Sequence, residues 1–116
     1  MGKFTVSKAT LRVGSVVLVT FPFSNLQGHK TRPALVLAQA EFGNLILCQI
    51  TSKNYSSKTA VRIGPAEFST GGLPIISFVR PDKLFTADPT IIKGMAGKLT
   101  TKMKNMILQK VSRLFT

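Results

Sequence analysis

The fold of this chain is decided by residues 30–38, Lys30-Thr31-Arg32-Pro33-Ala34-Leu35-Val36-Leu37-Ala38. Residues 34–38 are apolar at every position, which predicts a strand buried on both faces. The residues before them, 24–31, are polar and predict a loop. A second apolar run, 45–51, follows the turn signal Gly43-Asn44. The two runs are therefore predicted to pair as a β-hairpin.

Three further short strands are predicted around this hairpin. Residues 16–21 form a β-branched run that stops at Pro22, and residues 60–63 alternate before Gly64-Pro65. Residues 75–80 form another run, which we expect Pro81 to end because proline cannot donate to a strand ladder.

A helical period is convincing only at the C-terminus. Thr100 or Thr101 is available as its N-cap, and Lys110 and Arg113 lie in its last turns, where the helix dipole favours cations. One face of this helix is predicted from the apolar residues at helical spacing: Met103, Met106, Ile107, Val111, Leu114 and Phe115. Five or six strands and one terminal helix predict a mostly β fold, a small antiparallel barrel or sandwich. We expect one domain over residues 1–116, with a polar tail at 1–10.

The charge balance is the most unusual feature of the composition. Sixteen Lys and Arg residues face four Asp and Glu residues, a net charge of +12 at pH 7. Even if every acid paired with a base, twelve cations would find no acidic partner within the chain. Such a surplus points to a polyanionic partner: nucleic acid, an acidic protein or an anionic membrane.

The counts of other residues exclude several classes of protein. Cys48 is the only cysteine, so an intrachain disulfide is impossible, and His29 is the only histidine, so a structural zinc site is excluded. The four acids are far apart in the sequence, which argues against a hard-metal site, and no cofactor is expected. No apolar stretch approaches eighteen residues and the opening residues hold no signal peptide, so we expect a cytoplasmic protein without a membrane span.

Two residues at strand ends are candidates for phosphate chemistry. Arg32 precedes a proline, which holds its backbone extended and aims the guanidinium in one direction. It is either a phosphate clamp or a surface arginine. Thr51 ends the second apolar run, where its hydroxyl could donate to a phosphate oxygen or simply form a turn.

Arg80 and Asp82 flank Pro81 and can share one side of the chain. They form either a structural salt bridge or a base with a charge stabiliser. His29 has a pKa suited to acid–base work, but a lone loop histidine is more often only solvated. Lys30, Lys53 and Lys58 would extend a basic surface. We interpret the aromatic residues as core or partner-interface residues: Phe21, Phe23, Phe42, Phe78 and Phe85.

Taken in order, several segments resemble the MazF/PemK toxins. The similar segments are Gly14-Ser15-Val16-Val17-Leu18-Val19-Thr20-Phe21-Pro22-Phe23, Lys30-Thr31-Arg32-Pro33-Ala34-Leu35-Val36-Leu37, Cys48-Gln49-Ile50-Thr51-Ser52, Ser77-Phe78-Val79-Arg80-Pro81-Asp82-Lys83-Leu84-Phe85-Thr86 and Gly97-Lys98-Leu99-Thr100. The resemblance covers residues 12 to 115. No single motif is strong, but their order along so short a chain is specific.

The resemblance implies a small SH3-like barrel that dimerises and cuts single-stranded RNA without a metal, leaving a 2′,3′-cyclic phosphate. It also implies that an acidic antitoxin tail binds across the dimer. Arg32 and Thr51 fall on the positions used most consistently for cleavage. Arg80 and Asp82 match an Arg-x-Asp that Kid-like members use for proton transfer. Ser15 departs from the family, which usually has an acid there.

The remaining assignments follow from these positions. We expect RNA to contact His29, Lys30, Thr31, Ser52 and Lys53 beside Arg32 and Thr51; His29 corresponds to the family's loop histidine by loop, not by position. Cleavage by the 2′-hydroxyl needs a proton acceptor and groups that stabilise a developing dianion. Asp82 is the plausible acceptor, and Arg32, Thr51 and Arg80 are plausible stabilisers. Two other classes stay open: a gyrase-poisoning toxin of the same barrel fold (CcdB-like), and a basic nucleic-acid-binding SH3-like module without catalysis.

Overall fold

The computed structural model describes residues 11–21, 30–53 and 57–116, and the following account concerns this part of the chain. It contains seven strands, one α-helix and three single-turn 3-10 helices. The strands are β1 (Ser15–Phe21), β2 (Lys30–Gln39), β3 (Leu45–Thr51), β4 (Val61–Ile63), β5 (Phe68–Gly71), β6 (Ser77–Ala87) and β7 (Ile92–Leu99). The helix α1 (Thr101–Arg113) follows β7 directly.

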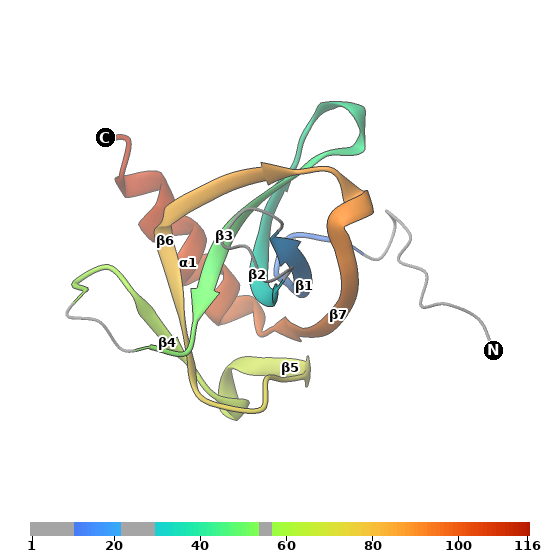
Figure 1. Ribbon diagram of the computed structural model, residues 1–116. Coiled ribbons are helices and arrows are strands. Elements are labelled where there is room, and N and C mark those ends of the chain that lie inside the picture. Colours follow the sequence, from blue (N-terminus) through green and yellow to red (C-terminus); the bar gives the residue numbers. More distant parts are fainter. Residues whose placement is uncertain (1–10, 22–29, 54–56) are drawn as a thin grey trace.

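All strands belong to one antiparallel sheet with the order β4-β6-β3-β2-β1-β7-β5. The sheet curls into a nearly closed barrel, and α1 packs beside β6 (Figure 1). The predicted β2–β3 hairpin is confirmed, with Leu35 opposite Cys48. The predicted mostly β fold with a C-terminal helix is therefore correct.

The central strands are buried on both faces, as the apolar run 34–38 predicts. Val17, Ala34 and Leu47 lie on one face in one core cluster. Their neighbours in sequence, such as Val16 and Leu35, lie on the other face in a second cluster, to which α1 adds Ile107. Since successive strand residues point to opposite faces, only a strand with apolar residues throughout can serve both cores.

The prediction that Pro81 ends its strand is wrong. β6 continues through Pro81 to Ala87, but its register against β3 jumps there. Leu84 lies opposite Cys48, whereas Arg80 lies opposite Gln49, so the three residues between Arg80 and Leu84 form a bulge. A proline is tolerated at this place because a bulged residue needs no ladder partner.

Two strands were not predicted, so the expected five or six strands are in fact seven. β7 holds Gly94 and Gly97, which lower its β-propensity. Gly97 is required by the close approach of β5, because a Cβ atom there would lie 2.6 Å from the carbonyl oxygen of Thr70. The predicted loop 24–31 also ended too late, since Lys30 and Thr31 already belong to β2; residues 24–29 lie outside the described part.

The helix begins as predicted, but its buried face is narrower. Thr100 is the N-cap, and its Oγ1 accepts the Met103 backbone N–H at 3.2 Å. Of the predicted apolar face, Ile107 is fully buried, and Met103 and Val111 pack against the core. Three residues predicted on that face are exposed instead of buried: Met106, Leu114 and Phe115.

The aromatic residues also divide between core and surface. Phe85 packs partly against the first cluster and Phe78 is half-buried. Phe42 lies in the β2–β3 turn and is 92 % exposed, so it does not belong to the core of this chain. Phe21 and Phe23 were predicted in the same class; Phe23 and the side chain of Phe21 lie outside the described part.

Candidate functional site

Arg32 and Thr51 line one groove, although nineteen residues separate them in the sequence. The groove has a volume of about 400 Å³ and lies where β2 begins and β3 ends. Its far wall is the segment before β6, including Leu73, Pro74 and Ile75. The antiparallel β2–β3 pairing brings these two strand ends together.

The local backbone orients both side chains. Arg32 is opposite Val19 of β1 in the ladder and is exposed to solvent. Thr51 Oγ1 accepts the backbone N–H of Lys53 at 3.1 Å, so Thr51 does form the turn that its position suggested. A hydroxyl that accepts this bond still has its own proton to donate. Thr51 can therefore shape the turn and donate to a ligand at once.

The groove combines an apolar floor with a cationic rim. Leu18, Pro33 and Ile50 are among its apolar lining residues. The polar side of the lining comes from the expected RNA-contacting residues and their neighbours: Thr31, Arg32, Thr51, Ser52, Lys53 and Ser77. No carboxylate is among the lining residues of this groove. Such a surface suits a phosphate bound by cations and hydroxyls, with an apolar sugar or base face against the floor.

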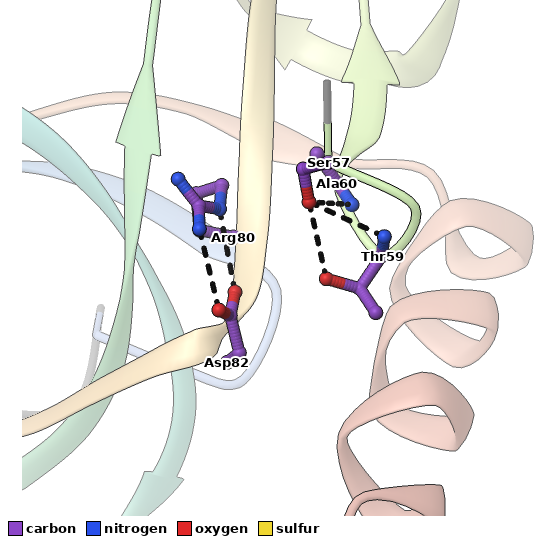
Figure 2. A network of polar contacts seen from close by, with 5 residues as sticks. All are labelled: Ser57, Thr59, Ala60, Arg80 and Asp82. Atoms are coloured by element: carbon purple, nitrogen blue, oxygen red, sulfur yellow. Dashed lines mark hydrogen bonds and ion pairs between the residues drawn. The ribbon is translucent and has the colours of Figure 1, made fainter. Parts of the chain in front are cut away.

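Arg80 and Asp82 pair with one another instead of lining the groove. Arg80 Nε donates to Asp82 Oδ1 at 3.3 Å and Arg80 Nη2 donates to Oδ2 at 3.2 Å, the two-pronged contact visible in Figure 2. The same close-up shows a second polar group, the turn before β4, where Ser57 Oγ accepts the backbone N–H of Ala60 at 3.2 Å.

The ion pair sets the proton affinity of Asp82. Burial raises the pKa of this carboxyl, but the hydrogen bonds from Arg80 and from its own backbone, with the charges of Arg80 and Lys83, outweigh burial and lower it. Asp82 is thus ionised at neutral pH, as a base must be. Its lowered pKa also makes it a weak proton acceptor.

Gln49 connects the two regions and was not singled out from the sequence. It lies on β3, opposite Ala34 of β2 on one side and opposite Arg80 of β6 on the other. Gln49 is exposed although both of its neighbours in sequence are buried. A polar residue between two apolar ones, Cys48 and Ile50, was the available signal.

The other singled-out residues have simpler outcomes. His29 lies outside the described part, and so does the side chain of Lys30. Burial, with a smaller contribution from the charge of Asp82, raises the pKa of Cys48 to about 12, so this thiol is no nucleophile near neutral pH. Ser15 is 1 % exposed, so an acid at its position would place a charge in the interior.

Over residues 11–21, 30–53 and 57–116, no group of three or more His, Cys, Asp and Glu side chains could hold a metal ion. Within the same ranges, no helix has the length and apolar character needed to cross a membrane.

The sequence from residue 12 to residue 115 matches the family of PemK-like, MazF-like toxins of type II toxin–antitoxin systems. The chain belongs to this family. The resemblance predicted from the sequence is therefore confirmed over nearly the whole length of this chain. No curated protein sequence matches it.

Solved structures share the fold of this PemK-like toxin. A MazE–MazF complex from Deinococcus radiodurans has a TM-score of 0.69 at 22 % identity, covering 88 % of this chain and 92 % of that chain. A mycobacterial endoribonuclease in complex with its cognate antitoxin has a TM-score of 0.65 at 17 % identity, with coverages of 86 % and 89 %. The Mycobacterium tuberculosis toxin MazF-mt6 has a TM-score of 0.64 at 21 % identity, with coverages of 87 % and 95 %. The likeness confirms the predicted barrel.

Proposed function

We propose that this toxin is an endoribonuclease that cleaves single-stranded RNA without a metal ion and thereby inhibits translation and growth. The observation that carries the proposal is the placement of Arg32 and Thr51 in one groove without a carboxylate. The family and the endoribonucleases among the structural neighbours support the same activity.

In the proposed reaction, the 2′-hydroxyl attacks the adjacent phosphorus and the P–O5′ bond breaks. The products are a 2′,3′-cyclic phosphate and a 5′-hydroxyl, so no water is consumed. Arg32 and the Thr51 hydroxyl would donate to the phosphate oxygens as charge develops on them. Thr31, Ser52 and Lys53 would hold the neighbouring phosphates or sugars, as would Lys30 and His29.

We assign Asp82 and Arg80 a supporting part in this proposal. Asp82 would accept the 2′-hydroxyl proton, with Arg80 stabilising charge. Their mutual ion pair and the lowered pKa of Asp82 limit how much they contribute.

To test metal-independent cleavage, purified toxin is incubated with a long single-stranded RNA in excess EDTA, and the ends of the RNA fragments are mapped. We expect cleavage at discrete sites, with cyclic phosphates on the 5′ fragments. Loss of cleavage in EDTA would contradict metal independence. Binding without cleavage would favour the non-catalytic module, and gyrase inhibition without either would favour the gyrase-poisoning class.

Two partners complete the proposal. One is a second copy of this chain, because apolar side chains stay exposed on the single chain, among them Ile75, Ile76 and Leu84. The other is an acidic antitoxin segment, which the net charge of +12 would attract. Sedimentation of the toxin at micromolar concentration tests the homodimer. We expect the neighbouring gene to encode this acidic antitoxin. Its addition should abolish RNA cleavage in the assay, and its coexpression should abolish cleavage in the cytoplasm.

A further inference from the structure

A second basic hollow lies at the other end of β1 and β2 from the Arg32–Thr51 groove. Its volume is about 620 Å³, against about 400 Å³ for the groove. Three cationic residues line it: Arg12 before β1, Lys98 in β7 and Lys104 in α1. The four acids of the chain are all absent from its lining: Glu41, Glu67, Asp82 and Asp88.

Two of these cations extend from ordered elements beside the hollow. Lys104 is only half-exposed because its stem lies over Gly14: a Cβ atom on Gly14 would be 3.0 Å from Lys104 Cδ. Lys98 is opposite Ser15 in the β1–β7 ladder. Both side chains therefore begin at ordered backbone positions beside the same hollow, and the packing of the Lys104 stem reduces the entropy that this side chain loses when a ligand binds it.

The charges are also unusual for this part of the fold. α1 has no acid in its first turn, where Lys102 and Lys104 lie instead. The positive end of the helix dipole disfavours cations there, and it favours an anion. An anionic ligand in the hollow would offset this unfavourable arrangement.

We propose that the hollow binds phosphates of the same single-stranded RNA that the groove cleaves, as a second RNA-binding site. This proposal rests on the proposed function. Arg32 and Gln39 mark the two sites on β2. The seven residue-to-residue steps from Arg32 to Gln39 span roughly 23 Å at about 3.3 Å each. That distance corresponds to about seven stacked nucleotides at roughly 3.4 Å each.

The lining favours RNA over an acidic protein segment. Cations and polar groups, such as Gln39 and Thr101, are sufficient to bind phosphates. A disordered acidic segment needs apolar anchors as well, in order to fold on its target. The apolar lining residues of the hollow offer little surface, because Leu99 is buried and Val13 is half-buried. None of the large exposed apolar side chains lines the hollow: Phe42, Ile75, Ile76, Leu84, Met106, Leu114 and Phe115.

The test compares two double variants that lose the same charge. Lys98→Gln/Lys104→Gln changes the hollow and keeps the Lys104 stem over Gly14. Lys93→Gln/Lys110→Gln is the control, on the same strand and helix but outside the hollow. The probes are 2′-O-methyl RNAs, which cannot be cleaved by 2′-hydroxyl attack, of about twenty and about four nucleotides; at roughly 3.4 Å per nucleotide only the longer one spans both sites.

For the longer probe, we expect the log–log salt slope of the Kd to become shallower by about 1.4 in the hollow variant, at roughly 0.7 per lost phosphate contact. The control variant should move by less than half of this. Cleavage of an unmodified four-nucleotide RNA should be the same in both variants and in the wild type. Thermal unfolding checks that both variants are folded; if the double variant is not, Lys98→Gln alone should shift the slope by about 0.7.

Equal salt slopes in the hollow and control variants would overturn the second site. The proposed function would survive that result if the wild type still cuts the four-nucleotide RNA. Polyglutamate serves as the acidic-protein probe. If its binding weakens in the hollow variant while RNA binding does not, the hollow belongs to an acidic partner and the RNA assignment is wrong.

Discussion

The Arg32–Thr51 groove and the Arg80–Asp82 pair lie on neighbouring strands, yet they use charge in opposite ways. In the groove, Arg32 and Lys53 face a lining without carboxylates, so their charge is available to a ligand. On β6, the guanidinium of Arg80 is bound to the carboxylate of Asp82 at 3.2 Å. A site for a phosphate needs the first arrangement, because an internal carboxylate competes with the phosphate for the cation.

The largest effect is expected at Arg32. Arg32→Ala should lower kcat/KM for RNA cleavage by roughly 100-fold or more, as loss of one transition-state donor does. Arg32→Lys should recover only part of the loss, because an ammonium lacks the guanidinium fork. Arg62→Ala, at an exposed position on β4 outside the groove, is the matched control. If the kcat/KM of Arg32→Ala stayed within a few-fold of the wild-type value, the groove would not be the site of RNA cleavage.

Thr51 should come next. Thr51→Val keeps the shape but removes the hydroxyl, both as acceptor from the Lys53 N–H and as donor to a phosphate. We expect kcat/KM to fall by roughly 10- to 100-fold, below the cost at Arg32 because a neutral donor is weaker than a charged one. Thr51→Ser should stay close to wild type. Single-turnover cleavage rates compare Thr51→Val with Thr51→Ser. An equal fall in rate for both variants would argue that Thr51 contributes through packing and not through its hydroxyl.

A smaller loss is expected at Asp82. Asp82→Asn should lower kcat/KM by about tenfold. Loss of a general base with a well-matched pKa costs roughly 100-fold or more, but Arg80 holds the pKa of Asp82 low and makes it a weaker base. The pH profile gives the sign. Asp82 is charged above its pKa, so the acid limb of kcat/KM should lie below the ordinary carboxyl value of about 4 and vanish in Asp82→Asn. An acid limb near pH 6 that persists in this variant would assign the base to another residue.

The smallest effect concerns stability and Asp88. The backbone N–H and the side chain of Thr90 lower the pKa of Asp88, which caps the 3-10 helix Pro89–Ile91. A lowered pKa in the folded state stabilises the protein above the unfolded value of about 4, and this contribution is lost as the pH falls further. Asp88→Asn should therefore flatten the fall of Tm between about pH 4 and 2. An unchanged acid slope of Tm in this variant would contradict the contribution.

Much of the architecture was predictable because it depends on local pattern. Residues 34–38 are apolar at every position and predicted a central strand buried on both faces. The next apolar run, 45–51, predicted its hairpin partner. Thr100 was recognised as an N-cap candidate because capping depends on a few adjacent residues. β7 was missed because its glycines lower its β-propensity. Gly97 is needed for a contact with β5, a strand that is distant in sequence and comes close only when the sheet curls.

The candidate site divides in the same way. The residue types of Arg32, Thr51, Arg80 and Asp82 were evident from the sequence, and so were the strand-end positions of Arg32 and Thr51. Their grouping was not, because it follows from strand register. The pairing of β2 with β3 placed Arg32 and Thr51 in one groove, and the three-residue bulge in β6 turned Asp82 toward Arg80. The same pairing placed Gln49 between the two regions.

The sequence by itself predicted the class of partner, since sixteen cations against four acids favour an anionic ligand wherever the chain places them. It also determined the mostly β class through the length and apolar character of its runs. Only the tertiary structure decided which cations lie together. Arg12, Lys98 and Lys104 come from three separate segments and meet at one hollow. Charge is additive along a chain, whereas a binding site depends on distances that the curled sheet alone sets.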